Sequence, residues 1–231
     1  MRKLGLIGGT GPESTIEYYK GIEYGVQRAC GRSFFPNLAI ESLSVFDVLG
    51  FCEQGDLDSL AEYLLRGFEN LAGAGAEFAA LTGITPHVVF DQLEAHSPIP
   101  LVSMVDAARD HALGRGFTKV ALLGTLPTMT GNFFQESFAA RGIEVVTPAT
   151  DDAAFIGEKI EHELELGIIN PHTQQRFAQI AERLVRERYA QAVVLGCTEL
   201  PLIFDGVDLP APTIDVMQVH IDTLVQMILA D

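Results

Sequence analysis

The stretch Lys3-Leu4-Gly5-Leu6-Ile7-Gly8 returns in similar form as Lys119-Val120-Ala121-Leu122-Leu123-Gly124, about 116 residues further along the chain. Two more stretches repeat in the same order, at offsets of about 114 and about 112 residues: residues 76–81 with 190–195, and residues 98–102 with 210–214. Buried strands resemble one another, so a single match means little. Three matches in order at nearly one offset indicate an internal duplication.

Short apolar runs alternate with longer amphipathic stretches, which is the pattern of strands alternating with helices. The candidate strands are residues 4–7, 38–43, 78–81, 101–104, 120–123, 144–146, 192–195 and 212–214, and the clearest helical patterns are residues 14–28, 58–72, 132–141 and 171–187. This alternation predicts the α/β class with parallel sheets. Together with the duplication it predicts two pseudo-symmetric lobes, one of residues 1–97 with 210–231 and one of residues 98–209. Ligands of open parallel sheets bind beyond the carboxyl ends of the strands, so we expect the active site in a cleft between the lobes.

Composition narrows the class of protein. The chain has 231 residues, 48% of them hydrophobic, so a sizeable core is expected. The formal net charge of -16 argues against nucleic acid or an anionic membrane surface as a partner, because neither attracts an acidic protein. Cys30, Cys52 and Cys197 fit no metal-binding spacing, and they are too few for a secreted disulfide-rich fold. With neither a signal peptide nor a membrane span in view, we expect a cytoplasmic protein without a metal site.

The first predicted strand ends in the glycine-rich segment Gly8-Gly9-Thr10-Gly11-Pro12-Glu13-Ser14. Glycine permits a tight turn and a close approach of a ligand, and Pro12 suits the first position of a helix, whose free N–H groups can bind an anion. A small carboxylate is therefore one expected ligand. A dinucleotide is another, because Gly9-x-Gly11 before Ser14 resembles a nucleotide fingerprint without its third glycine, with Glu41 as the ribose acid. A turn without any ligand is the third reading.

The counterpart in the second half is Leu123-Gly124-Thr125-Leu126-Pro127-Thr128. It places two threonine hydroxyls at a strand end, where they either contact a ligand or only cap the next helix. The sequence favours neither reading, and Thr125 is kept as a candidate substrate-binding residue.

Cys197 lies at another strand end, in Gly196-Cys197-Thr198-Glu199, and we expect a helix after it. A thiol at a helix N-terminus has a lowered pKa and is reactive, and Glu199 is near enough to orient a ligand ammonium group. The alternative is a small buried cysteine that only packs, which is also what we expect of Cys52. By the internal offset, Cys197 corresponds to Gly83. One lobe thus presents a thiol where the other presents bare backbone.

The chain resembles the aspartate/glutamate racemase family over nearly all of its length. Its segment Ile7-Gly8-Gly9-Thr10-Gly11-Pro12-Glu13-Ser14-Thr15 resembles the family's opening Gly-Gly-Met-Gly/Ser-x-x-(Ser/Ala)-Thr turn, and Leu122-Leu123-Gly124-Thr125 resembles its mid-chain Leu-Gly-Thr. Leu195-Gly196-Cys197-Thr198-Glu199 matches the second catalytic motif, and Ile214-Asp215 resembles the terminal motif. The resemblance implies two Rossmann-like lobes with the last helix packed on the first, no pyridoxal phosphate or metal, and a homodimer.

In that family two cysteines flank the α-carbon, and one thiolate removes a proton while the opposite thiol donates one. The first cysteine lies in a Cys-Asn-Thr-x-His motif, which reads Gly83-Ile84-Thr85-Pro86-His87 here and departs from the pattern at its first two positions. Arylmalonate decarboxylases of the wider superfamily are similar in having glycine there and one cysteine in the second lobe. For the second face, Thr82, Thr85, His87 and a bound water are the candidates.

The resemblance therefore implies a cofactor-independent racemase that acts on the α-carbon of an acidic amino acid by thiol-based proton transfer, with a bias toward one enantiomer. The alternatives are a single-cysteine decarboxylase or isomerase of a dicarboxylate, and a non-catalytic amino-acid-binding relative. No arginine is evidently placed to bind a side-chain carboxylate. The expected catalytic positions are Cys197, Gly83 and Thr82, and the expected substrate-binding residues are Thr10, Ile84, Thr85, Thr125, Thr198 and Glu199.

Overall fold

The computed structural model describes residues 1–31 and 33–230, and the chain divides into two compact units. The first unit comprises Met1–Met104 and the segment from His220 on, and the second comprises Val105–Val219. We predicted both boundaries earlier in the chain, at 97/98 and 209/210. The difference has a simple cause in the pairing of two short strands. β4 (Leu101–Val102) pairs with β3 (Phe78–Leu81) in the first unit, and β8 (Thr213–Asp215) pairs with β7 (Val193–Gly196) in the second.

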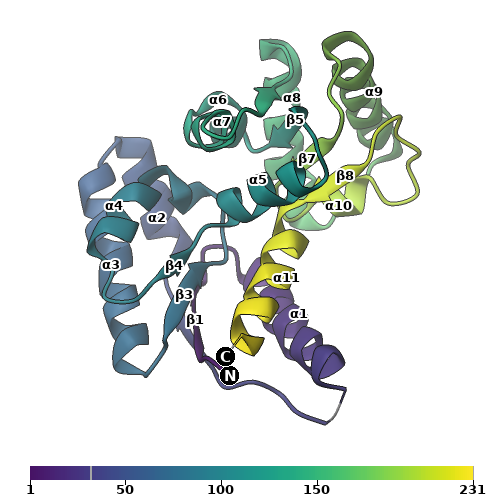
Figure 1. Ribbon diagram of the computed structural model, residues 1–231. Helices are drawn as coiled ribbons and strands as arrows, with labels where there is room; N and C mark the ends of the chain where they lie inside the picture. The colour runs from purple at the N-terminus through teal and green to yellow at the C-terminus, as the bar shows by residue number, and fades with distance from the viewer. Residues whose placement is uncertain (32, 231) are drawn as a thin grey trace. The chain divides into compact units, whose positions relative to one another are not determined.

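Each unit contains a parallel sheet with the same topology (Figure 1). The first has the order β2-β1-β3-β4, with β1 at Leu4–Gly8 and β2 at Leu38–Ser42. The second has the order β6-β5-β7-β8, with β5 at Lys119–Gly124 and β6 at Glu144–Val146. The predicted α/β class and its two similar lobes are therefore confirmed. The strand predicted at residues 101–104 is shorter than expected, because Met104 already begins a helix.

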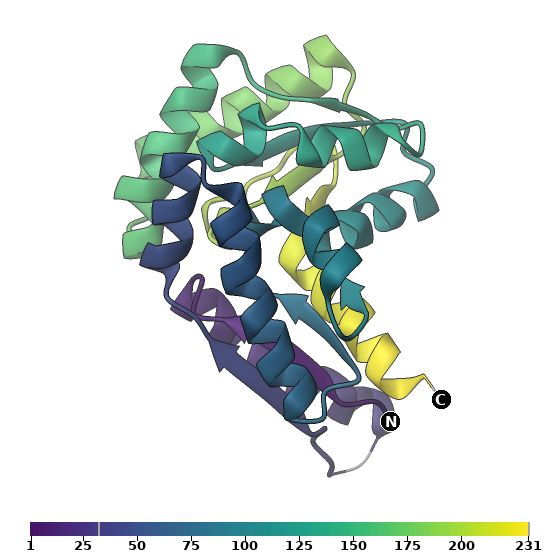
Figure 2. The ribbon, with the colours of Figure 1, turned by 90° about the vertical axis from the view of Figure 1, so that its left-hand side faces the viewer.

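Helices cover both faces of the first unit's sheet (Figures 1 and 2). α2 (Val45–Gln54) and α3 (Leu57–Gly73) lie on one face, and α1 (Pro12–Cys30) and α11 (Val216–Leu229) lie on the other. Successive residues of a strand point to opposite faces, so Ile7, Ala79 and Leu81 join the core beneath α3, together with its Leu64 and Phe68. A short 3-10 turn (Thr85–Val89) and α4 (Phe90–His96) connect β3 to β4.

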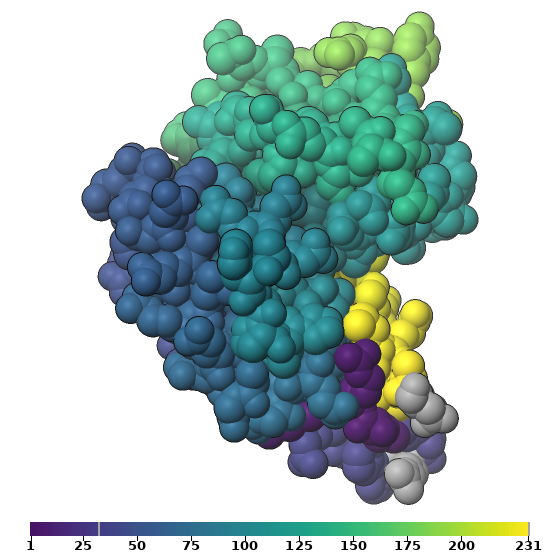
Figure 3. Space-filling model, turned by 60° about the vertical axis from the view of Figure 1, so that its left-hand side comes forward, coloured from purple at the N-terminus to yellow at the C-terminus, as the bar shows by residue number. Residues whose placement is uncertain are grey.

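α1 and α11 approach each other closely because α1 has glycines at the contact. A side chain at Gly21 would come within 2.9 Å of Ile221 Cδ1, and one at Gly25 within 2.8 Å of Val225 Cγ2. The N-terminal strand region joins the same contact, since the Arg2 amide donates a hydrogen bond to the Ile228 carbonyl at 3.0 Å. Figure 3 shows α11 in yellow beside the purple N-terminal residues. The last helix is thus an integral part of the first unit.

The second unit repeats the same plan with different helices. Its helices are α5 (Met104–Gly114), α6 (Leu126–Thr130), α7 (Phe133–Ala139), α8 (Thr150–His162), α9 (Pro171–Arg188) and α10 (Leu200–Ile203), with a 3-10 turn at Leu164–Leu166. Leu123 and Leu195 of the sheet form a core with Ile156 of α8 and Phe177 of α9. No helix within the described residues is long and apolar enough to cross a membrane.

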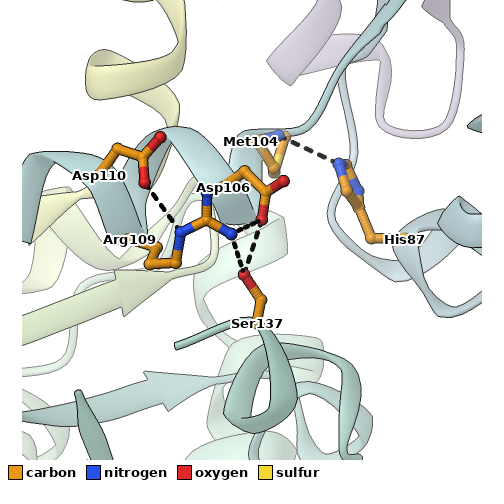
Figure 4. A network of polar contacts seen from close by, with 6 residues as sticks. All are labelled: His87, Met104, Asp106, Arg109, Asp110 and Ser137. Atoms are coloured by element: carbon orange, nitrogen blue, oxygen red, sulfur yellow. Dashed lines mark hydrogen bonds and ion pairs between the residues drawn. The ribbon is translucent and has the colours of Figure 1, made fainter. Parts of the chain in front are cut away.

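α5 is fixed to α7 by polar contacts of its own side chains, as Figure 4 shows. Arg109 Nη1 lies 2.5 Å from Asp106 Oδ1 and 3.1 Å from Ser137 Oγ, and Ser137 Oγ donates to the same Asp106 oxygen at 2.7 Å. Arg109 Nε also donates to Asp110 at 2.8 Å. A carboxylate shared between a guanidinium and a hydroxyl holds both donors in one geometry, so this cluster holds α5 against α7 within the second unit.

Two buried histidines lie close to the two points where the chain passes between the units. His87 Nδ1 donates to the Gly83 carbonyl at 3.1 Å, and His87 Nε2 accepts from the Met104 amide at 3.2 Å (Figure 4). His220 Nδ1 accepts from the Tyr18 hydroxyl at 2.7 Å, and its Nε2 donates to the Val102 carbonyl at 3.2 Å. Each ring needs one donor and one acceptor nitrogen, so both are held in the neutral form.

Burial lowers the pKa of His87 to about 4, and burial with the neighbouring His87 lowers the pKa of His220 to about 3. An unfolded histidine has a pKa of about 6.5, so below that pH the unfolded chain takes up protons that the folded chain does not. We therefore expect the free energy of unfolding to decrease as the pH falls from about 6.5 toward about 4, by about 1.4 kcal/mol per pH unit for each histidine. Urea unfolding at a series of pH values measures this slope.

The variant His87→Asn isolates one histidine, because an amide at this position still offers a donor to Gly83 but does not titrate. We expect its unfolding free energy to depend less on pH than that of the native protein between pH 6.5 and 4, by the slope of one histidine. Identical slopes in the two proteins would show that His87 is not held neutral.

Candidate active site

The loop after β1 is shaped by glycine. Gly9 has a φ of 78°, and a side chain there would collide with the Leu43 carbonyl oxygen, so only glycine fits this turn. The Gly9 amide donates to Thr15 Oγ1 at 3.0 Å, which ties the loop to the first turn of α1. α1 begins at Pro12, as predicted. The loop therefore has a fixed geometry at the carboxyl end of the strand.

Thr82 follows β3 and continues its pairing with β1. The Thr82 amide donates to the Ile7 carbonyl at 3.0 Å, and the Thr82 hydroxyl donates to the same oxygen at 3.1 Å. The hydroxyl lies 3.3 Å from Thr15 Oγ1 and is fully buried. A hydroxyl engaged in this way stabilises the strand end, and we assign no proton transfer to it. His87 is equally unsuited as a base, since both of its ring nitrogens are occupied.

Gly83 comes next and faces Thr10 of the β1 loop. A Cβ on Gly83 would lie 2.8 Å from Thr10 Oγ1 and 3.1 Å from the Thr10 carbonyl oxygen. Ile84 and Thr85 are both partly buried at the start of the 3-10 turn, and no side-chain hydrogen bond of Thr85 is found within the described residues. The first unit therefore brings Thr10, Gly83, Ile84 and Thr85 to neighbouring strand ends, as the sequence predicted.

Cys197 occupies the matching place in the second unit, directly after β7. Its side chain is partly buried, and the thiol donates a hydrogen bond from Sγ to Glu199 Oε2 at 2.8 Å. The helix that we expected after Cys197 is present but has only four residues and begins at Leu200. The thiol is thus in contact with a carboxylate. It does not lie at the positive end of a long helix.

The predicted lowering of the Cys197 pKa is wrong. Burial of the thiol raises its pKa well above the usual value, and the charges of Glu199 and Glu165 raise it further. Both carboxylates disfavour a thiolate beside them, and so short a helix offers little compensation. Cys197 is therefore a protonated thiol in the resting protein.

No sequence pattern pointed to Glu165, which lies in the 3-10 turn Leu164–Leu166. Burial raises the pKa of Glu165, and the charge of Glu199 raises it further. A glutamate in a polar segment looks like any exposed residue until folding brings it near Cys197. The environment of Cys197 is consequently acidic, and it suits a cationic group of a ligand better than an anionic one.

The threonines of the second unit differ in exposure. Thr125 Oγ1 and Thr128 Oγ1 lie 2.9 Å apart, and Thr128 is buried. Neither hydroxyl caps α6, so the capping alternative is not supported. Thr198 is partly buried beside Cys197. Thr125 and Thr198 remain candidates for substrate binding, whereas Thr128 belongs to the core.

Three further readings of the sequence can be compared with the structure. The predicted ribose acid, Glu41, accepts a hydrogen bond from Asn70 Nδ2 at 2.9 Å. This contact gives the Glu41 carboxylate a structural role and does not support the nucleotide reading. Cys52 packs against the first unit's core, as expected. Within residues 1–31 and 33–230, no group of three or more His, Cys, Asp or Glu side chains could hold a metal ion.

Comparisons with known proteins agree on one family. Residues 7–224 match the Asp/Glu/Hydantoin racemase family. A broad-specificity amino-acid racemase of Bacillus subtilis (strain 168), RacX, is 24% identical over 219 residues, which cover 92% of each chain. A candidate Asp/Glu racemase from Yersinia pestis has a similar structure, with a TM-score of 0.95, 31% identity and 100% coverage of both chains. An aspartate racemase homologue from Pyrococcus horikoshii OT3 gives a TM-score of 0.88 and 32% identity, again with 100% coverage of both.

The acidic surroundings of Cys197 lead to a direct prediction. Replacing Glu199 by Gln removes the negative charge nearest the thiol, so the pKa of Cys197 should fall. The rate of alkylation by iodoacetamide as a function of pH reports this pKa, in a background where Cys30 and Cys52 are replaced by serine.

Glu182→Gln is the matched control, because it removes one carboxylate from α9 that is engaged with Arg186 and does not act on Cys197. It should leave the alkylation profile unchanged. A Glu199→Gln profile that coincides with that of Glu182→Gln would contradict the electrostatic account.

Proposed function

We propose, from the premise that this chain belongs to the Asp/Glu/hydantoin racemase family, that it inverts the α-carbon of an amino acid by proton transfer through Cys197. The observation that carries the proposal is the 2.8 Å hydrogen bond between the Cys197 thiol and the Glu199 carboxylate, at the end of β7. A proton donor and an acceptor for a ligand ammonium lie side by side there. Neither pyridoxal phosphate nor a metal is needed for the steps proposed below.

In one direction Cys197 acts as an acid. The resting thiol is protonated, because burial and the two glutamates raise its pKa. It can therefore deliver a proton to an α-carbanion without prior activation. The thiolate that forms is then left next to Glu199, and the substrate ammonium offsets the repulsion between the two negative charges.

In the other direction Cys197 acts as a base, which requires a thiolate. A substrate ammonium bound to Glu199 places a positive charge beside the thiol and opposes the two carboxylates that keep it protonated. Substrate binding would thus lower the pKa of Cys197 when the base is needed. This role for Glu199 extends the predicted one, in which it only orients the ammonium.

Among the predicted candidates for the second face of the α-carbon, the described residues supply no comparable acid or base. Gly83 offers no side chain, and the Thr82 hydroxyl and the His87 ring are held by hydrogen bonds. What remains among the predicted candidates is the Thr85 hydroxyl or a bound water, and both are weak bases at neutral pH. We therefore propose that proton exchange is faster from one enantiomer than from the other.

The substrate class is a matter for direct measurement. Aspartate and glutamate follow from the family resemblance. The charged groups that act on Cys197 in the described residues, Glu199 and Glu165, offer nothing to a side-chain carboxylate. We therefore propose that neutral and basic amino acids are tested beside the acidic ones. For the assembly, a homodimer remains our expectation.

A single-cysteine decarboxylase is the second candidate. Gly83 stands where the family has its first catalytic cysteine, so Cys197 is the one catalytic thiol expected. Such an enzyme would protonate one face of a carbanion after loss of carbon dioxide. The hydrogen bond from Cys197 to Glu199 favours a racemase, since a malonate-type substrate has no ammonium for Glu199 to bind.

Exchange of the α-proton in deuterium oxide tests the proposal. We expect deuterium to enter separately supplied D- and L-enantiomers of aspartate, glutamate, alanine, lysine or arginine, with unequal rates for the two enantiomers of the best substrate. Each tenfold inequality corresponds to about 1.4 kcal/mol in barrier. Cys197→Ser should lower the faster rate about 100-fold or more, because it replaces the acid/base with a poor one.

Cys30→Ser and Cys52→Ser are the matched controls and should retain native exchange. Full exchange in Cys197→Ser would end the proposal. Equally fast exchange from both enantiomers would remove the bias and require a strong second base. Release of carbon dioxide from phenylmalonate, with no exchange on any amino acid, would favour the decarboxylase.

A further inference from the structure

We propose that Thr10 supplies the substrate-binding hydroxyl of the first unit, in the space that a side chain at position 83 would otherwise fill. The hydroxyl would bind the α-carboxylate of an amino acid. This inference rests on the proposed function and deepens it, because it names the group that takes the place of a missing side chain.

The first step is the geometry of Thr10 and Gly83. β1 and β3 are neighbours, with Ile7 opposite Leu81, so the residues beyond their ends are brought together. Thr10 Oγ1 lies 2.8 Å from the position of a Cβ on Gly83, and the Thr10 Cβ lies 3.5 Å from it. A distance of 2.8 Å is shorter than two such atoms tolerate. A side chain at position 83 would therefore require the Thr10 hydroxyl to move.

The second step is that backbone conformation does not explain the glycine. Gly83 is not among the glycines with positive φ, whereas Gly9 and Gly11 in the facing loop are, with φ values of 78° and 137°. A positive φ therefore does not account for glycine at position 83. Glycine at this position is explained by Thr10, and the two residues form one steric unit.

The third step is the state of the hydroxyl itself. Thr10 Oγ1 is shielded from solvent and has no hydrogen-bond partner within the described residues. A hydroxyl buried without a partner is destabilising, so such groups are rare unless a ligand or an ordered water satisfies them. By contrast, the nearby Thr15 and Thr82 hydroxyls are both bonded to backbone carbonyls. Among the described residues at this strand end, Thr10 Oγ1 is the buried hydroxyl oxygen without a partner.

The fourth step identifies the ligand group. Residues 9–11 and 82–85 contain no charged side chain, so nothing in this loop pair repels an anion. The substrate of the proposed function carries a carboxylate on its α-carbon. This carboxylate is the acceptor to which the Thr10 hydroxyl would donate a charge-assisted hydrogen bond.

Thr10→Val and Thr10→Ser form the test pair, because valine keeps the shape and loses the hydroxyl, whereas serine keeps the hydroxyl. For the best substrate, we expect kcat/KM for deuterium exchange to fall about tenfold or more in Thr10→Val, which is about 1.4 kcal/mol, and to stay near native in Thr10→Ser. Removal of an unbonded buried hydroxyl should also raise the Tm of Thr10→Val by about 2–4 °C. A merely structural threonine would give a lower Tm.

The steric pairing is tested separately with Gly83→Ala. It should lower the Tm in the native background and lower it less in Thr10→Ala, because the hydroxyl nearest to the new methyl group is then absent. Equal losses in the two backgrounds would overturn the proposed exclusion.

Native kcat/KM in Thr10→Val, or a loss of kcat/KM together with a lower Tm, would overturn the inference. If the native protein exchanges no proton, the rise in Tm with each amino acid of the panel becomes the readout. Binding that Thr10→Val weakens would then support Thr10 while the proposed function fails. A native protein that neither exchanges nor binds any amino acid would overturn both.

Discussion

The parallel pairing of β1 with β3, and of β5 with β7, determines where every candidate site residue lies. Ile7 is opposite Leu81, and Leu123 is opposite Leu195, so the two units are in the same register. Gly83 and Cys197 each follow the paired leucine at the same distance along the chain, and they are equivalent positions. Parallel strands release their carboxyl ends at one edge of a sheet. One position gives a thiol and the other a bare peptide because the sequences differ, while the backbones agree.

Two opposing effects act on the thiol of Cys197, and their sizes decide which prevails. The start of a helix favours a thiolate, typically by about 0.3–1 kcal/mol for an exposed group, and α10 has only four residues to offer. A carboxylate in direct contact, a second carboxylate nearby and partial burial all disfavour it. The protonated form therefore prevails in the resting protein. A chemical role for such a thiol depends on a cation delivered by the ligand.

Much of the fold could be predicted from local pattern, because a buried parallel strand is a short apolar run and a covering helix is amphipathic. The offset between the halves also identified Gly83 as the position equivalent to Cys197 in the repeat. The unit boundaries were harder, since β4 and β8 are too short to show which sheet they join. The contacts of Glu165 and the rotamer of Thr10 depend on tertiary packing, which leaves no periodic trace in the sequence. The pKa of Cys197 was mispredicted because a helix start is visible in a sequence and its length is not.

The order of the elements along the chain has a consequence for how the protein is made on the ribosome. The part of α11 from His220 on completes the first unit, yet the second unit, Val105–Val219, is translated between β4 and that part of the helix. Until then Gly21 and Gly25 of α1 lack the Ile221 and Val225 side chains that cover them in the native fold. The second unit can therefore finish folding while the face of α1 that α11 later covers is still exposed in the first unit. A nascent chain paused before α11 would be the form most in need of a chaperone.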